Sequence, residues 1–470
     1  MKRQQRSTTS RALTLLTAIL PLVAACSSSP DVPLGQEGNI AGFIGGVVAD
    51  EPQAALVGRR VLASGGSAAD AATAMGFAMA VTLPSRAGLG AGGACLAYDP
   101  KSTGPGGGNP EAILFPAVAP ANPGRADRPA SVPMLARGLV LLQARYGVLP
   151  VEGLMGPAEQ YARLGVQVSR ALLRDLAVVA GPLSADAGAR SVFMHNGVPL
   201  REGDLLLQPE LATSIAKLRQ SGIGDLYQGQ LAQRLVEAMP SAGGGLSISD
   251  LRVALPSFTP ALQRAYNVQD SFAYLPANVP GGLATAAAVE ALIKNNTDLA
   301  GAQRRVAAIQ GALRRGAAPE VALLDQSLPD ADLGTLPASA VFGAVDHDGK
   351  AAMCAVSMGN LFGTGRVAQG TGILLGASPA SKPAPLLSLA MMTNRALEGF
   401  RGAAGGTGQE AAPVAAAFGL LEGLQGHLPA SPPEPGRADV LACTTILPKL
   451  NGGCGWSADP RGLGLAIGGN

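Results

Sequence analysis

The chain has 470 residues, of which 35 are Lys or Arg and 33 are Asp or Glu, so its formal net charge is only +2. This sparse and balanced charge argues against a nucleic-acid partner, and the hydrophobic share of 47% argues against a disordered chain. The only long apolar run without a charge covers residues 12–25, which is shorter than the roughly 20 residues that span a bilayer. We therefore expect a compact protein with ample material for a buried core, built as one large domain or as a few ordinary ones.

The N-terminus has the pattern of a targeting segment. Four basic residues lie within the first 11 positions, and small residues close the apolar run that follows. Residues 22–26, Leu-Val-Ala-Ala-Cys, resemble the lipobox of bacterial lipoproteins. The resemblance implies a signal peptide over residues 1–25, lipidation of Cys26 as a membrane anchor, and a flexible tether over residues 26–38. It also implies a cell-envelope protein that faces the periplasm, on the outer membrane rather than the inner one because Ser27 follows the cysteine. The alternative is an ordinary secretory signal in which Cys26 is incidental.

Four cysteines remain after Cys26, and disulfides persist in an exported protein. Of the three possible pairings we favour Cys443 with Cys454, because these two lie close together in a Gly-rich tail. Cys95 and Cys354 stand in apolar, strand-like runs, where we expect them to pack as small hydrophobic side chains. No zinc-ligand spacing occurs and the three histidines are scattered, so we predict no metal, no cofactor and no Ser-His-Asp triad.

Periodicity predicts mixed α and β elements along the chain. Apolar spacing and capping patterns indicate helices over residues 54–63, 67–83, 139–146, 158–164, 230–239 and 284–294, strands over 94–98 and 271–275, and a turn over 280–282. Residues 88–93 formally match the dinucleotide fingerprint G-x-G-x-x-G, but they follow a helix and precede a strand, which is the reverse of that motif's order. Such mixing indicates α and β layers around one core.

A β-hairpin is predicted over residues 341–357. Strands over 341–345 and 351–357 flank a tight turn that ends in Asp-Gly. Whether the loop has two or four residues, the residue opposite Ser339 falls between Val356 and Met358, so Ser357 can lie beside Ser339. Two neighbouring hydroxyls at the start of a strand are also typical of ordinary surface polarity.

A second Gly-rich element covers residues 402–406, Gly-Ala-Ala-Gly-Gly, and leads into an apolar helical stretch that ends at Leu424. Thr407 and Glu410 have the spacing of a capping box, and a first helical turn at Pro413 is the alternative start. In a loop beside a helix N-terminus, the N–H groups of Gly405 and Gly406 would be free to hold an oxyanion.

These features together resemble the gamma-glutamyltranspeptidase family of N-terminal-nucleophile hydrolases, over nearly the whole chain after the signal. The segments that carry the resemblance stand in the family's order, at residues 48–72, 84–93, 138–150, 157–169, 225–229, 280–282, 345–349, 362–365, 371–375 and 458–461. The resemblance implies an α+β fold, a four-layer α/β/β/α sandwich.

The family's precursor cuts itself before a threonine that lies seven residues upstream of an aspartate matched here by Asp346, and Ser339 holds that position. The resemblance therefore implies a large region, residues 39–338, and a small region, residues 339–470, that stay associated after cleavage. It further implies that the Ser339 Oγ attacks a small-molecule amide, with the new α-amine as its base, and passes the acyl group to water or an amine. The supporting roles fall on Ser357 beside the nucleophile, on Gly405 and Gly406 at the oxyanion, and on Asn360 and Ser388 as substrate contacts.

The positions that recognise the glutamyl group depart from the family pattern. Residues 115–120 read Phe-Pro-Ala-Val-Ala-Pro where the family has F-R-E-x-A-P, so the arginine that grips a carboxylate is missing. Residues 376–379 read Gly-Ala-Ser-Pro where the family has an acidic residue, and Leu387-Ser388 occupies the place of the family's serine pair. The family's asparagine position falls at Gly359, one place before Asn360.

The sequence leaves open whether the missing arginine is replaced by Arg86, Arg125 or Arg128. The expectation is a gamma-glutamyltransferase-like enzyme acting on γ-glutamyl or related amides. The alternative is an inactive or substrate-shifted relative that serves as a binding or structural lipoprotein of the cell envelope.

Overall fold

The structure, a computed structural model, describes residues 42–102, 108–294, 298–448 and 453–469. The predicted signal, the Cys26 anchor and the tether lie outside these described residues. Within the described ranges, no helix has the length and apolar character that crossing a membrane requires. The described residues form one unit by their internal contacts.

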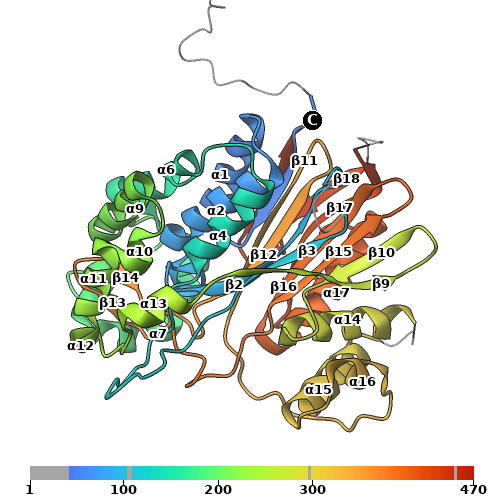
Figure 1. The fold of residues 1–470 in the computed structure, drawn as a ribbon. Helices are drawn as coiled ribbons and strands as arrows, with labels where there is room; N and C mark the ends of the chain where they lie inside the picture. Colours follow the sequence, from blue (N-terminus) through green and yellow to red (C-terminus); the bar gives the residue numbers. More distant parts are fainter. Residues whose placement is uncertain (1–41, 103–107, 295–297, 449–452, 470) are drawn as a thin grey trace, which may run out of the picture. The chain divides into compact units, whose positions relative to one another are not determined.

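Two antiparallel sheets stand at the centre of the part that is described (Figure 1). The first sheet has the strand order β19-β1-β11-β12-β2-β3-β8, and the second has the order β18-β17-β16-β15-β10-β9. The strands of the first sheet are β1 (Gly45–Ala49), β2 (Gly92–Tyr98), β3 (Glu111–Phe115), β8 (Ser257–Pro260), β11 (Ala340–Asp346), β12 (Ala351–Ser357) and β19 (Leu465–Gly469). Those of the second are β9 (Leu262–Ala265), β10 (Asp270–Tyr274), β15 (Ser388–Asn394), β16 (Gly399–Thr407), β17 (Arg437–Leu447) and β18 (Cys454–Ser457).

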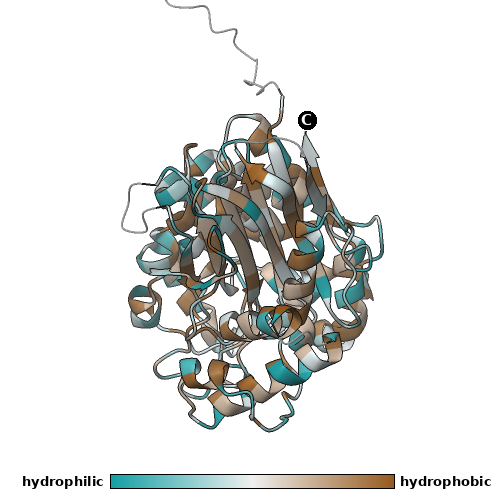
Figure 2. Ribbon diagram, turned by 90° about the vertical axis from the view of Figure 1, so that its right-hand side faces the viewer, coloured by the Kyte–Doolittle hydropathy of each residue, from teal (hydrophilic) through white to brown (hydrophobic). Residues whose placement is uncertain are grey.

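Helices cover the outer face of each sheet, and side-chain alternation along the strands explains the layers. On β11, Phe342 packs with α1 (Pro52–Ala63), α2 (Ala68–Thr82) and α4 (Leu135–Tyr146), whereas Val341 and Val345 face the second sheet. The second sheet's outer face packs against α14 (Pro280–Ile293) and α17 (Ala412–Leu424). The predicted four-layer α/β/β/α sandwich is therefore confirmed, and Figure 2 shows apolar residues along its central strands.

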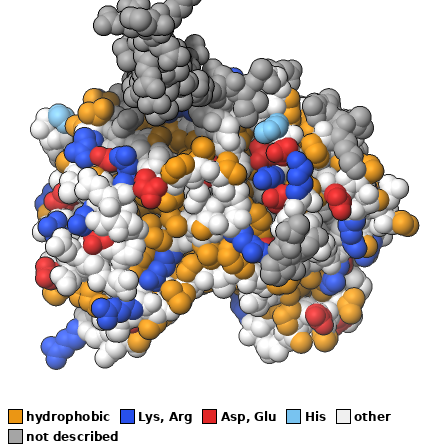
Figure 3. Space-filling view, turned by 45° about the horizontal axis from the view of Figure 1, so that its top comes forward, with side chains coloured by type: hydrophobic (Ala, Val, Ile, Leu, Met, Phe, Trp, Pro, Cys, Tyr) orange, Lys and Arg blue, Asp and Glu red, His pale blue; other side chains and the backbone are white. Residues whose placement is uncertain are grey.

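The remaining elements are short strand pairs and helices. The pairs are β4 (Val166–Gln167) with β7 (Leu205–Leu206), β5 (Met194–His195) with β6 (Val198–Pro199), and β13 (Val367–Ala368) with β14 (Ile373–Leu374). The helices are α3 (Pro84–Ala87), α5 (Val151–Leu154), α6 (Gly156–Leu164), α7 (Arg170–Ser184), α8 (Ala187–Phe193), α9 (Pro209–Ser221), α10 (Asp225–Gln228), α11 (Gln230–Glu237), α12 (Met239–Ala242), α13 (Ile248–Val253), α15 (Leu299–Arg314), α16 (Pro319–Leu324) and the 3-10 turn η3 (Gln409–Ala411). On the face that Figure 3 shows, basic and acidic side chains are interspersed, as the balanced composition implies.

Several sequence-based predictions are confirmed. The capping box that opens α2 is present, because the Ser67 side chain accepts from the Asp70 N–H and the Asp70 carboxylate accepts from the Ser67 N–H. Cys443 and Cys454 form a disulfide between β17 and β18. The strand predicted over residues 351–357 coincides with β12.

Three local predictions were wrong. Residues 280–282 form the first turn of α14 rather than a turn between elements. The segment at 402–406 lies inside β16, and α17 begins at Ala412 with Pro413 in its first turn and without a side-chain cap, so the Thr407–Glu410 capping box is not made. Cys95 and Cys354 are not separate hydrophobic side chains but a disulfide across the paired strands β2 and β12.

Candidate active site

The β11–β12 hairpin brings the two predicted hydroxyl residues together. Ala340 lies opposite Val356 and Val341 opposite Ala355, so the next pair in register is Ser339 with Ser357, as the turn geometry predicted. The Asp346 carboxylate fixes the turn by accepting backbone N–H bonds from Asp348 and Lys350, each at 3.0 Å. It also accepts from the N–H of Ala68 at 3.0 Å, which ties the hairpin to the start of α2.

The Ser357 hydroxyl contacts the peptide bond that precedes Ser339. Its Oγ donates to the carbonyl oxygen of Ala338 at 2.7 Å and accepts from the N–H of Gly359 at 3.0 Å. Because the Gly359 N–H occupies a lone pair of Oγ, the hydroxyl proton is directed at the Ala338 oxygen. A donor in this position withdraws electron density from the Ala338 carbonyl and stabilises a negative charge that develops on its oxygen.

Ser339 itself is buried at 2% exposure and borders a polar cavity of about 210 Å³. Within the part of the chain that is described, its side chain makes no hydrogen bond, so its Oγ is not committed to another partner. The other residues that line this cavity are Asp50, Leu83, Arg86, Ala171, Arg174, Ala338, Thr407, Gly408, Gln409, Pro435, Arg437 and Gly462.

Charged groups surround the start of β11. Asp50 Oδ2 accepts from the N–H of Val341 at 2.7 Å, while Arg86 forms a two-pronged ion pair with the buried Asp175 at 2.8 and 2.7 Å. Burial raises the pKa of Asp50 to about 6, although the nearby Arg86 opposes the shift. Burial and the Asp50 carboxylate also raise the pKa of Asp439 on β17 well above its usual range.

Replacing Asp50 should change how stability depends on pH. Because burial raises the folded-state pKa of Asp50 from 3.8 to about 6, its contribution to stability is fully present below pH 3.8 and is lost as the pH rises through about 6. Between pH 4 and pH 8, the protein that retains Asp50 should therefore lose about 2 kcal/mol more unfolding free energy than the Asp50→Asn protein. Urea unfolding of both proteins in a Ser339→Ala background, where each is expected to stay one chain, measures this difference. Parallel pH profiles would contradict the assignment.

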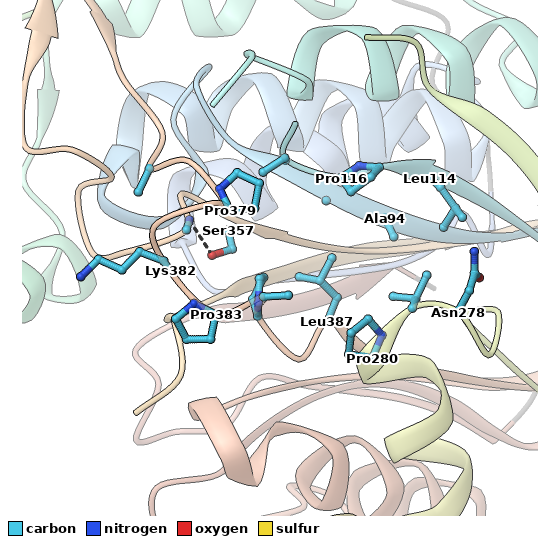
Figure 4. A pocket seen from close by; sticks show the side chains of 18 residues that line it. Ala94, Leu114, Pro116, Asn278, Pro280, Ser357, Pro379, Lys382, Pro383 and Leu387 are labelled. Carbon is cyan, nitrogen blue, oxygen red and sulfur yellow. Dashed lines mark hydrogen bonds between the residues drawn. The ribbon is translucent and has the colours of Figure 1, made fainter. Parts of the chain in front are cut away.

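A second cavity of about 210 Å³ is lined by Ser357, the donor of the hydrogen bond to Ala338. Ser357 and Gly359 line it, together with apolar residues from β2, β3 and the segment before β15 (Figure 4). Ser357 thus borders the apolar cavity, whereas both residues of the Ala338–Ser339 peptide bond border the polar cavity.

Four other predicted site residues line neither cavity. Gly405 and Gly406 pair with β15 on one side and β17 on the other, so their N–H groups lie in the sheet and not in an open loop; the prediction of free oxyanion donors was wrong at this point. Asn360 is exposed and lines neither cavity, and the buried Ser388 donates its hydroxyl proton to the Leu386 carbonyl at 2.9 Å. Neither of these two residues lines the cavity that Ser339 borders.

The three candidate arginines differ in whether they border a cavity. Arg86 lines the polar cavity, where Asp175 holds it. Arg128 donates to the Thr364 carbonyl at 2.9 Å, and both it and Arg125 are exposed and border neither cavity. Sequence reasoning missed Asp50 and Gln409, whose Nε2 donates to the Leu336 carbonyl at 2.5 Å, because these contacts join positions far apart in the chain.

Comparison with known proteins places the chain in a family. Residues 54–327, more than half of the chain, match the gamma-glutamyltranspeptidase family. The chain belongs to that family. The gamma-glutamyltranspeptidase match ends upstream of Ser339, so the role of the hairpin rests on its own geometry.

Individual relatives of this gamma-glutamyltranspeptidase family member match in part. A glutathione hydrolase proenzyme of Escherichia coli (strain K12) is 31% identical over 250 residues, which cover 48% of this chain and 42% of that protein. An acylase ACY 1 proenzyme of Pseudomonas sp. (strain SE83) is 29% identical over 229 residues, which cover 45% of this chain and 41% of that protein. The matched part thus spans less than half the length of either relative.

Solved structures match over more of the chain. A cephalosporin acylase from Bacillus halodurans aligns with a TM-score of 0.72 at 18% identity, over 92% of this chain and 97% of that one. Gamma-glutamyltranspeptidase from Helicobacter pylori aligns with a TM-score of 0.51 at 21% identity, over 62% of this chain and 90% of that one. At these identities the likeness shows the fold.

Proposed function

We propose that the protein is a self-processing amide-cleaving enzyme whose nucleophile is Ser339. The observation that carries the proposal is the 2.7 Å hydrogen bond from the Ser357 Oγ to the Ala338 carbonyl, next to an uncommitted Ser339 hydroxyl. Self-processing is supported by the family membership and by the relatives that are named proenzymes.

Processing begins when the Ser339 Oγ attacks the Ala338 carbonyl carbon. The Ser357 hydroxyl stabilises the negative charge on the Ala338 oxygen. The bond from this carbon to the Ser339 nitrogen breaks, and the nitrogen takes up the proton that Oγ releases. Water then hydrolyses the resulting ester, which leaves a carboxylate on Ala338 and a free α-amine on Ser339.

The new α-amine supplies the base that a chain with three histidines otherwise lacks at this position. It accepts the Oγ proton while Oγ attacks a substrate amide, and it returns the proton to the leaving amine. The acyl group remains on Oγ as an ester until water or an amine acceptor removes it. An unperturbed α-amino group has a pKa of about 8, so a useful fraction is unprotonated near neutral pH.

Trapping the acyl-enzyme tests this proposal. Purified protein is mixed with an acyl p-nitroanilide and quenched in acid, and its fragments are analysed by mass spectrometry. We expect the acyl mass on the fragment that begins at Ser339, and tandem spectra should assign it to the Ser339 side chain. Acylation of another residue, or turnover without any adduct on this fragment, would overturn the assignment of Ser339.

The disulfide between Cys95 and Cys354 should keep the two fragments covalently linked after cleavage. Cys95 belongs to the large region and Cys354 to the small region, on strands that pair directly. On a denaturing gel without reductant we expect one band of precursor size, which separates into two bands when reductant is added.

Cysteine variants provide matched controls for this prediction. Replacing Cys95 and Cys354 by Ala should give two bands even without reductant. Replacing Cys443 and Cys454, which both lie in the small region, should leave the pattern unchanged. Two bands from the cleaved wild-type protein without reductant would contradict the cross-link.

A further inference from the structure

The apolar cavity beside Ser357 has a lining that indicates which acyl group the enzyme takes. We propose that this cavity binds the acyl part of the amide substrate, and that this acyl group is apolar and uncharged, of the size of a phenylacetyl or hexanoyl group. The inference rests on the proposed function and extends it to a substrate class.

The position of Ala338 marks the place where a substrate acyl group must sit. During processing, Ala338 is itself the acyl group that the Ser339 Oγ attacks, and its carbonyl oxygen is held by the Ser357 hydroxyl at 2.7 Å. The same nucleophile and the same donor act on a substrate amide, so the substrate carbonyl takes the place that Ala338 leaves. Ala338 itself lines the polar cavity, whereas Ser357, which holds its carbonyl oxygen, borders the apolar cavity. A substrate carbonyl held by the Ser357 hydroxyl can therefore carry a chain that extends into the apolar cavity.

The cavity wall offers almost nothing to a charged acyl group. Of its 18 lining residues only Asn278, Ser357 and Lys382 have polar side chains, and none is acidic (Figure 4). Lys382 is exposed and extends away from the other labelled side chains in the close-up view. Because no acidic side chain lines the cavity, the α-ammonium of a glutamyl group would have no ionic partner here, which opposes binding.

The replaced recognition positions of the sequence converge on this one cavity. Pro116, at the place of the missing arginine, lines it together with Gly359, Ala377, Pro379 and Leu387. Each of these residues stands where the resemblance led us to expect a polar or charged group, or next to such a position. The apolar lining is thus a property of the whole cavity and not of a single substitution.

The size of the cavity sets the length of the acyl group. Its volume of about 210 Å³ exceeds that of the roughly 150 Å³ cavity that accommodates benzene in another protein. A phenyl ring or a chain of five carbons beyond the carbonyl therefore fits. Each buried methylene favours binding by about fourfold, so a hexanoyl group should gain on the order of 100-fold over an acetyl group.

Comparing p-nitroanilides of the wild-type protein tests the proposal. We expect kcat/KM for the phenylacetyl and hexanoyl anilides to exceed that for the acetyl anilide by on the order of 100-fold, with the γ-glutamyl and glutaryl anilides at or below the acetyl value. A higher kcat/KM for either the γ-glutamyl or the glutaryl anilide than for the hexanoyl anilide would overturn the inference.

Filling the cavity provides the variant test. The Ala117→Trp variant should lower kcat/KM for the hexanoyl anilide by at least about tenfold and leave kcat/KM for the acetyl anilide little changed. If this variant does not fold, Ala384→Trp on the exposed wall takes its place. Val268→Trp, at a fully exposed position outside the cavity, is the matched control and should leave all rates unchanged. Equal losses for both anilides, in a variant shown by N-terminal sequencing to be processed, would contradict an acyl-binding role.

Failure of the inference can be distinguished from failure of the proposed function. If the protein hydrolyses no anilide, calorimetric titration with phenylacetamide tests the cavity alone. Binding to the wild-type protein that is lost in the cavity-filling variant supports the apolar site, and absence of binding overturns it.

Discussion

The Ser339→Ala protein is expected to remain one uncut chain and to lose amide hydrolysis by more than about 10⁴-fold. Without Oγ there is no atom to attack the Ala338 carbonyl, so neither the ester of processing nor the acyl-enzyme forms. A denaturing gel with reductant measures the first effect, because the disulfide between Cys95 and Cys354 would otherwise hold cut fragments together. A p-nitroanilide assay measures the second effect.

Conservative variants control for a folding defect in this experiment. Ser339→Thr retains a hydroxyl and should still be cut, and Ser339→Cys supplies a thiol in the same position. If Ser339→Ala separates into the same two fragments as the wild-type protein, cleavage does not depend on this side chain. That outcome would remove Ser339 from the proposed chemistry.

The Ser357→Ala protein is expected to cut itself about 10²- to 10³-fold more slowly than the wild-type protein, as when one oxyanion donor is removed from an enzyme. Ser357 donates to the Ala338 oxygen at 2.7 Å, so its loss leaves the developing negative charge without this donor. The fraction of uncut chain, followed on reducing gels after purification, gives the rate.

Ser357→Thr is the matched control, because threonine keeps a hydroxyl on the same strand. It should be cut within about tenfold of the wild-type rate, provided that its hydroxyl reaches the Ala338 oxygen. A Ser357→Ala protein that is cut at the wild-type rate would show that the hydrogen bond has no part in processing.

The hairpin with Ser339 could be predicted from the sequence because its geometry is local. A tight turn restricts the register of the two strands that it joins. The observed pairing of Ala340 with Val356 lies between the registers of the two loop lengths considered and places Ser357 opposite Ser339, within the predicted range. Likewise, the capping box at Ser67 and Asp70 involves residues three positions apart, and it is present in the structure.

The Gly-rich strand β16 could not be predicted because tertiary contacts determine it. Glycine disfavours a strand, yet a Cβ on Gly405 would lie 2.3 Å from Val341 Cγ1 in the facing sheet. A Cβ on Gly406 would lie 1.9 Å from the Ala412 carbonyl oxygen at the start of α17. These glycines therefore allow the layers to approach closely, which is a different role from that of a loop presenting free N–H groups.

Contacts between distant segments explain the other misses. Cys95 and Cys354 are separated by 259 positions and become neighbours only because β2 pairs with β12. The sequence indicates each replaced recognition residue separately, at positions from Pro116 to Leu387. Only the folded chain shows that these residues line one cavity beside Ser357.

The most direct test of the account is to determine the chain ends of the purified wild-type protein after incubation at neutral pH and reduction of its disulfides. N-terminal sequencing and intact mass should identify a fragment that begins at Ser339 and a second fragment that ends at Ala338. A protein that stays uncut during long incubation, or that is cut at a different bond, would contradict the central claim.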